Sequence, residues 1–380
     1  MTAPDPAALA FAWVQRLPPA ALRASPADTA HAEMLSAIGV AAVLLAAWAI
    51  GRSGLLHRIS QRLEAAGRPH WMADAACGGA VAGLIAFALV PLATVAAAPT
   101  GYLPALVLAL RQDAVIALMG ALGAVLLYGL MRAAPRRWAA ILGGLSGLAA
   151  LAAVWLPFAL ARGPASLPTA PAGPARDGLL QLIAQTQLPA SEVYITPAHV
   201  IDADVTGLGA ARVSVSRGLW DVASPQELRA SIGHLMGHWV HHDQLWIALM
   251  LAAVALGLFL IPKALYPAVA RLLKLPADIA APLSLPALVI LATLWLCIGV
   301  VADHALIRWV NVRADQYSLD HAREPDGLAQ TLLREWRGED PDPSPLQEAL
   351  FYDHPSLQSR MLHAMRWKAG HTVAEPQLPR

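Results

Sequence analysis

Two histidines four residues apart are the residues of this sequence whose type and spacing most directly suggest chemistry. His234 and His238 lie in the stretch HLMGHWVHHD, residues 234–243. If this stretch is helical, both imidazoles point from one face, one turn apart. The spacing is that of a His-Glu-x-x-His helix, in which the histidines bind zinc and the glutamate is the general base. Leu235 stands where that glutamate would be, so the ligand spacing is present and the base is absent.

The residues just before the histidines predict the helix that would carry them. Ser224 can accept a hydrogen bond from the backbone N–H of Glu227, whose side chain can reach back to the backbone of Ser224. Pro225 would occupy the first helical position, where its missing N–H costs nothing. We therefore expect a helix that starts here and continues through His238.

The composition indicates a membrane protein. The 380 residues are 57% hydrophobic and 14% charged, which is a low charged fraction for a soluble protein. Six apolar runs are each long enough to cross a hydrocarbon core of about 30 Å. These runs are Met34–Gly51, Met72–Ala98, Ala114–Met131, Trp138–Ala161, Leu245–Pro262 and Leu285–Ala302. The net charge of +1 gives no reason to expect a nucleic-acid partner.

Basic residues predict the orientation of the chain in the membrane. The loops after the first, third and fifth runs carry arginines, among them Arg58, Arg136 and Arg271, and the opposite connections are poor in charge. Since cytoplasmic loops are enriched in Lys and Arg, the N-terminus is expected outside the cytoplasm. Residues 162–244 and 303–380 then lie together on the non-cytoplasmic side. The histidine helix and the C-terminal segment can therefore meet.

The same pattern suggests where the domains begin and end. Residues 1–162 are expected to form a transmembrane region of four helices, followed by a Pro/Gly/Ala linker at 163–176. Residues 177–380 would form the domain that carries the histidines, including the last two spans. Short alternating runs at Glu192–Thr196, Ala203–Thr206 and Arg212–Ser216 predict a small β-sheet before the histidine helix.

Four segments, in order and spacing, resemble one family. They read DADVTGLGAARVSVSRGLW (202–220), HLMGHWVHHD (234–243), RWVNVRADQYSL (308–319) and DHPSLQSR (353–360). Together they resemble the integral-membrane zinc metallopeptidases that include the type I CAAX prenyl endopeptidase and the bacterial heat-shock protease HtpX. The resemblance implies a mainly α, polytopic membrane protein with about six transmembrane helices. It also implies a zincin-like metallopeptidase domain that contains a small β-sheet.

The resemblance assigns roles to single positions, and both glutamates of the family site are replaced. The zinc-ligand histidines fall on His234 and His238, and the catalytic glutamate falls on Leu235. The third zinc ligand is the glutamate of a Glu-x-x-Ala-Asp motif, which reads Asn311-Val312-Arg313-Ala314-Asp315 here, so the ligand position is Asn311.

Other parts of the family site are retained. The aspartate of that motif is Asp315, a plausible partner for a ligand histidine, and Arg308 is expected nearby in the same supporting shell. The His-Pro motif is kept at His354, which the resemblance assigns to stabilising the oxyanion. The strand that borders the family's cleft, and whose edge can pair with an extended peptide, falls on Ala203, Asp204, Val205 and Thr206.

The two replacements predict a loss of catalysis. Leucine can neither take a proton from water nor pass one to a leaving amine, and such general acid–base help is typically worth ~10²–10⁴ in rate. An amide in place of a carboxylate removes a negative charge and is a poor zinc ligand. We expect zinc binding to be weakened or absent. The predicted function is that of a catalytically degenerate homologue that binds peptides or membrane proteins.

Two alternatives stay open at this stage. The protein could be an active endopeptidase with substitute groups: Asp303, Asp315 or Asp320 as the carboxylate, or His238 with His242 as a chelating pair. A transporter-like or purely structural membrane protein is the other alternative, and the shortage of intramembrane charges argues against it. Asp74, inside the second run, is a functional-site candidate by default.

The expected location and partners follow from this reading. We expect a bacterial inner-membrane protein whose peptidase-like domain lies on the periplasmic side. Its expected partners are peptides or membrane proteins and the surrounding lipid, with no nucleic acid.

Overall fold

Long apolar runs form the long helices of the structure. The computed structural model of the protein describes residues 5–96, 102–160 and 167–371. Within these residues, six helices are long and apolar enough to cross a membrane. They are α2 (Pro19–Arg52), α4 (His70–Ala96), α5 (Tyr102–Ala133), α6 (Trp138–Ala159), α10 (Asp243–Leu273) and α11 (Leu285–Ala322). The predicted mainly α, polytopic fold is confirmed. Residues 97–98 and 161, at the ends of two predicted runs, lie outside the described residues.

Shorter helices surround the small sheet and connect the long ones. They are α1 (Pro6–Val14), α3 (Leu55–Ala65), α7 (Pro174–Gln185), α8 (Arg217–Trp220), α9 (Pro225–Val240), α12 (Pro325–Glu335), α13 (Pro345–Phe351) and α14 (Leu357–Gly370), with a 3₁₀ turn at Pro282–Ser284. Helix α9 is the predicted histidine helix. The sequence analysis did not anticipate α1 and α12.

The chain divides into two compact units. The histidine unit comprises the described residues of Met1–Ala30, Leu151–Met250 and Val301–Arg380. The helical unit comprises His31–Ala150 and Leu251–Val300, again over the described residues. Each unit has its own buried clusters, and each is described separately below.

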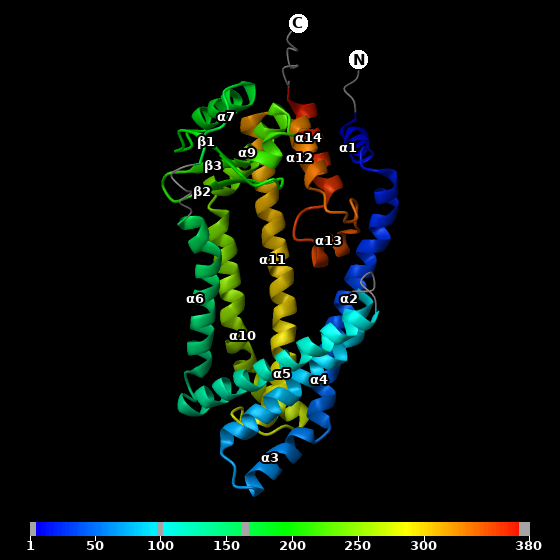
Figure 1. Ribbon diagram of the computed structural model, residues 1–380, viewed down its shortest axis with the longest axis vertical. Coiled ribbons are helices and arrows are strands. Elements are labelled where there is room, and N and C mark those ends of the chain that lie inside the picture. Colours follow the sequence, from blue (N-terminus) through cyan, green and yellow to red (C-terminus); the bar gives the residue numbers. More distant parts are fainter. Residues whose placement is uncertain (1–4, 97–101, 161–166, 372–380) are drawn as a thin grey trace. The chain divides into compact units, whose positions relative to one another are not determined.

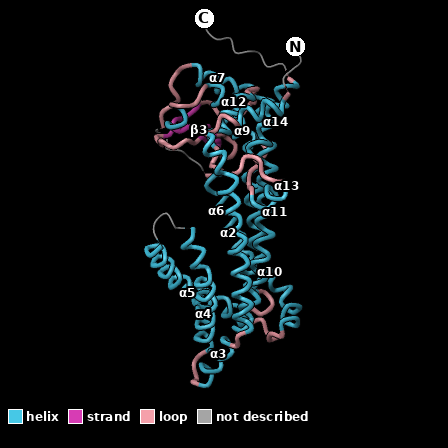
Figure 2. Tube along the Cα trace, turned by 90° about the vertical axis from the view of Figure 1, so that its right-hand side faces the viewer, coloured by secondary structure: helices cyan, strands magenta, loops and turns pink. Residues whose placement is uncertain are grey.

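Small residues bring α4 and α5 of the helical unit into close contact. Figure 2 shows the two helices side by side as a hairpin. A Cβ added to Gly78 would lie 2.3 Å from the Cβ of Ala124, and one added to Gly120 would lie 2.3 Å from the Cβ of Ala82. Because no side chain fits at these positions, glycine is required there. Such small-residue contacts are a common way for membrane helices to associate.

The sheet of the histidine unit has the strand order β1-β3-β2. Its strands are β1 (Val193–Thr196), β2 (Ala203–Thr206) and β3 (Arg212–Ser216), which confirms the predicted small sheet. Strand β1 runs parallel to β3, and β2 runs antiparallel to it. Strand β2 is therefore an edge strand. On the far side of β1, Thr169 from the expected linker forms a bridge with Tyr194.

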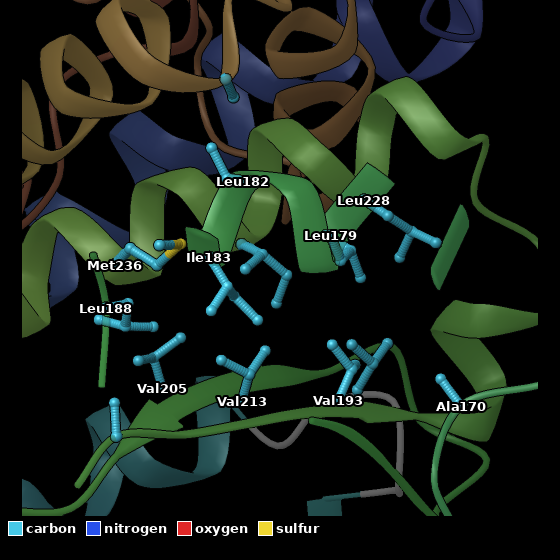
Figure 3. Close-up of a cluster of buried hydrophobic side chains, with 14 of the residues drawn as sticks. Ala170, Leu179, Leu182, Ile183, Leu188, Val193, Val205, Val213, Leu228 and Met236 are labelled. Atoms are coloured by element: carbon cyan, nitrogen blue, oxygen red, sulfur yellow. The ribbon is translucent and has the colours of Figure 1, made fainter. Parts of the chain in front are cut away.

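Helices α7 and α9 cover one face of this sheet (Figure 1). Because side chains alternate along a strand, Val193, Val205 and Val213 project from the same face. Figure 3 shows them facing side chains of the two helices, including Leu179 and Met236. This buried cluster fixes α9 against the sheet, and so fixes the histidines relative to the edge strand β2.

The N-terminal helix packs on the C-terminal helices of the same unit. Ala10, Trp13 and Val14 of α1 are buried in one cluster with Met361 and Met365 of α14. The segments expected on the non-cytoplasmic side thus share a core with the N-terminal helix. A membrane cannot separate groups that pack together, so these segments lie on the same side.

The start of α9 has the predicted capping box. The hydroxyl of Ser224 accepts from the backbone N–H of Glu227 at 3.2 Å, and the backbone N–H of Ser224 donates to the Glu227 carboxylate at 3.4 Å. Pro225 occupies the first turn. Arg334 of α12 also binds the Glu227 carboxylate, which joins the start of α9 to α12.

Close contact between α9 and α11 leads to the first prediction. A Cβ on Gly237 would lie 2.9 Å from the Cα of Ala314 and 3.0 Å from the Cβ of Tyr317. Gly237→Val should therefore separate the helices and lower the free energy of unfolding by about 1–3 kcal/mol. Thermal unfolding of the purified protein measures this effect. Gly144→Val is the control, since a Cβ at Gly144 meets no atom within 4 Å. Equal losses in both variants would contradict the packing described here.

Candidate functional site

The two histidines of α9 face each other through one ring nitrogen each. The Nε2 atoms of His234 and His238 are 3.0 Å apart. On the opposite side of each ring, Nδ1 of His234 lies 2.8 Å from Asp315 Oδ1, and Nδ1 of His238 lies 2.8 Å from Asp243 Oδ2. Because an ionised carboxylate only accepts hydrogen bonds, each Nδ1 carries the hydrogen. Both Nε2 lone pairs then point at one place, as in a pair that binds a cation.

Each carboxylate is held in turn by an arginine. Asp315 is 1% exposed, and Arg360 of α14 donates to its two oxygens at 2.7 Å through Nε and a terminal nitrogen. Asp243 is also 1% exposed and binds Arg313. The bidentate contact between Arg360 and Asp315 fixes geometry as well as charge. The orientation of each imidazole is thus set by an Arg–Asp pair behind it.

His234 is in the protonation state that metal binding requires. Burial lowers the pKa of His234 to about 4, although its hydrogen bond to Asp315 acts in the opposite direction. The ring is therefore neutral at pH 7. A metal-binding histidine must be neutral, and its second nitrogen usually donates to a carboxylate or carbonyl. His234 meets both conditions.

The position of the third family ligand does not fit zinc. Asn311 is 4% exposed, and its Nδ2 donates to the carbonyl of Ile307 in its own helix at 2.9 Å. Across the described residues, no three His, Cys, Asp or Glu side chains are grouped to hold a metal ion. Tetrahedral zinc takes four donors, and catalytic sites supply three from protein. This site offers two well-placed histidine nitrogens and an amide.

A cavity of about 440 Å³ lies beside His234. Leu235 and Ser231 of α9 line one side, and Asp202 and Ala203, at the start of β2, line another. Leu235 also packs against the buried cluster of the histidine unit. At the position expected for a general base, the cavity wall is therefore a leucine side chain.

Glu335, at the end of α12, is a cavity residue that the sequence analysis missed. It lines the cavity beside His234 and also an adjoining smaller cavity that contains His354. The Glu335 side chain is exposed to these cavities. Loss of hydration against the surrounding protein raises the pKa of Glu335, and the positive charge of Arg360 acts in the opposite direction. The amphipathic pattern of Pro325–Glu335 was the signal that could have revealed its helix.

Two other expected site residues form their hydrogen bonds with residues outside the histidine pair. His354 is about half exposed, and its Nδ1 lies 2.9 Å from Asp353 Oδ1. It lines the smaller cavity with Glu335 and Arg360. Arg308 donates to the carbonyls of Glu348 and Tyr352 in and after α13, and so supports the segment that leads to His354.

The four residues of β2 differ in their surroundings. Ala203 lines the cavity beside His234, and Asp204 is exposed. Val205 and Thr206 are buried. The strand therefore meets the cavity at its first residue.

Three of the substitute groups considered from sequence, Asp315, Asp320 and His242, lie in unfavourable places. Asp315 faces Nδ1 of His234, on the far side of the ring from the Nε2 pair. Asp320 accepts from Gln316 and Trp367, both at 2.8 Å. His242 follows the end of α9 with a left-handed φ of 56°, so it does not continue the face of that helix.

Zinc affinity provides the second prediction. Loss of a hydrogen bond that supports a metal ligand costs a metal site roughly 10–100-fold in affinity. Asn311→Glu restores a ligand itself, so its zinc affinity should exceed that of the unmodified protein by more than this factor. Competition with a chromophoric chelator at pH 7 measures both affinities. Asn311→Gln is the control, because it adds length without charge. Equal affinities for the glutamate and glutamine variants would contradict the assignment of Asn311 to the third ligand position.

Comparisons with known proteins identify the family. The model of peptidase family M48 matches residues 174–368, more than half of the chain. Protease HtpX of Acinetobacter baylyi is 28% identical over 222 residues, which are 51% of this chain and 72% of that protein. Protease HtpX of Acinetobacter baumannii (strain AYE) is 26% identical over 220 residues, with the same coverage.

A solved structure is also similar. The crystal structure of S. mikatae Ste24p aligns with a TM-score of 0.47 and 15% identity, over 76% of this chain and 74% of that one. With its six apolar helices and its HtpX relatives, this chain is an integral membrane protein. On the family model's match, it belongs to peptidase family M48.

Proposed function

We propose that this protein is a membrane-bound M48 homologue that has lost peptidase activity and binds peptides or segments of membrane proteins. The observation that carries the proposal is Leu235, which lines the cavity beside His234 at the position of the general base. The amide of Asn311, directed to its own helix, supports it. A hydrolase of this family needs a base and a complete zinc site, and both are compromised by these two residues.

Peptide binding would depend on the edge strand and the cavity. Strand β2 pairs with β3 along one edge, and an extended peptide could add along the other. Such pairing uses backbone hydrogen bonds and needs neither glutamate. The cavity at the start of β2 would receive a side chain or chain end, and its lining residues Arg337, Glu335 and Asp202 favour a polar one. Substrate-like recognition can therefore survive without hydrolysis.

One observation favours an active enzyme as a second candidate. Glu335 is a carboxylate in the cavity that His234 and Leu235 line, and its raised pKa suits a group that exchanges protons. In that case Glu335 would replace the missing base. The second candidate still needs a metal site that lacks its third carboxylate, so we favour the binding function.

Activity provides the third prediction. The unmodified protein should show no zinc-dependent cleavage of a peptide library, and neither Leu235→Glu nor Asn311→Glu alone should restore it. The double variant should raise the rate, because members of a catalytic unit act together and single changes are grossly non-additive. Mass spectrometry of the products measures cleavage.

The controls separate the two candidate functions. Adding His238→Ala to the double variant should abolish any gained activity. Glu335→Gln in the otherwise unmodified chain should change nothing. Zinc-dependent cleavage by the unmodified chain that Glu335→Gln removes would overturn the binding function and establish the active enzyme.

The orientation remains a proposal, supported by packing and by loop charges. Helices α1, α9 and α14 share buried contacts within the histidine unit, and the basic loops at Arg58 and Arg136 belong to the helical unit. We propose a bacterial inner-membrane location with the histidine unit in the periplasm, because Lys and Arg mark cytoplasmic loops.

Cysteine labelling in intact cells provides the fourth prediction. The native Cys77 and Cys297 are first replaced by alanine, and single cysteines are then placed at Trp220, Arg58 or Arg136. A membrane-impermeant maleimide should label position 220 and leave positions 58 and 136 unlabelled until the cells are opened. The reverse pattern would show that the histidine unit is cytoplasmic.

A further inference from the structure

Asp74 and Asp113 are carboxylates on the neighbouring candidate membrane helices α4 and α5, and their partners differ. Asp74 is fully buried, and Arg132 of α5 binds both of its oxygens. The helical unit thus neutralises this carboxylate internally. Oδ1 of Asp113 is also buried, yet it accepts no hydrogen bond from any residue that the structure describes. This oxygen is therefore free to pair with a group that enters from outside the described chain.

Asp113 lines a cavity of about 690 Å³ in the helical unit. The walls come mostly from the α4–α5 hairpin, and Leu142, Phe259 and Leu285 of α6, α10 and α11 complete them. Gln112 and Asp113 are the polar side chains in a lining that is otherwise apolar. The volume falls within the roughly 300–1,000 Å³ typical of small-molecule sites, and such sites combine apolar walls with a few polar groups.

The depth of Asp113 makes an unpaired charge costly. Asp113 lies 11 positions after Tyr102, the first residue of α5. At 1.5 Å per residue, this is about 16 Å along the helix. An ionised carboxylate at such a depth in a membrane helix is expensive, and such residues are usually paired or functional. A cation that enters the cavity would supply the partner that Oδ1 of Asp113 lacks among the described residues.

We propose that this cavity binds a lipophilic ammonium ion, whose cationic nitrogen pairs with Asp113 and whose apolar body fills the cavity. A metal cation fits less well, because Ca²⁺ and Mg²⁺ take six or more oxygen ligands and the lining offers one carboxylate and one amide. A neutral lipid would fit the walls but would leave Asp113 without a partner. An ammonium group needs few acceptors, and the carboxylate of Asp113 and the amide oxygen of Gln112 can provide them.

The test compares three amphiphiles with the same chain. The full-length protein in an uncharged detergent is titrated with dodecylammonium, dodecanol or dodecanoate at pH 7, and its melting temperature is recorded. Dodecylammonium should stabilise the unmodified protein at concentrations about tenfold or more below those that dodecanol requires, because pairing with a desolvated charge adds to the contacts of the chain. Dodecanoate should not stabilise it.

Variants of α5 identify the site. Asp113→Asn should remove the preference for dodecylammonium over dodecanol, and Asp113→Glu should keep it. Gly123→Leu should fill the cavity and abolish stabilisation by dodecylammonium and by dodecanol, since Gly123 lines the cavity and a Cβ there meets no atom within 4 Å. Gly129→Leu is the matched control: its Cβ is equally free, and Gly129 lies outside the cavity lining.

Two outcomes would overturn the proposal. In the first, dodecylammonium and dodecanol stabilise the unmodified protein equally, which would mean that Asp113 takes no part in binding. In the second, the preference for dodecylammonium persists in Asp113→Asn, which would place the ammonium site elsewhere. Neither outcome depends on peptidase activity.

Discussion

The buried ion pair between Asp315 and Arg360 is the interaction on which the histidine site depends. It joins α11 to α14, and through His234 it joins both to α9. Removing one partner of such a pair leaves an uncompensated buried charge and typically costs about 3–5 kcal/mol. Asp243 and Arg313 hold His238 in the same way from α10 and α11. These pairs position both imidazoles whether or not a metal is bound.

This dependence explains how the frame of the site can persist while its chemistry changes. Leu235 and Asn311 take no part in either ion pair. Leu235 adds apolar contact with the buried cluster, and the Asn311 amide is bonded within its own helix, so neither replacement leaves an unpaired charge. On the proposed function, the two replaced positions belong to the reaction, and the aspartates and arginines belong to the fold. A binding function needs the aspartates and arginines and does not need the glutamates.

Local sequence patterns were enough to predict the apolar helices, the three short strands and the capped helix with His234 and His238. The family motif added Asp315, which the structure finds bonded to His234. Patterns could not reveal Glu335 in the cavity, because that contact forms between segments that only packing brings together. Asp243 is five residues from His238, but it reaches the ring only because α9 ends at Val240 and α10 begins at Asp243, a boundary that was not predicted. The same holds for Asp113, whose Oδ1 has no hydrogen-bond partner among the described residues; Asp113 sat at the edge of a predicted span and lies well inside α5.

Comparing peptide cleavage by the unmodified protein with cleavage by His238→Ala tests the central claim most directly. Both proteins are purified in the same detergent with zinc present and are given the same labelled peptide library at high enzyme concentration. His238 supplies one of the two nitrogens of the cation-binding pair, so any hydrolysis that depends on this site requires it. We predict the same background rate for both proteins. Cleavage by the unmodified protein that His238→Ala abolishes would contradict the account.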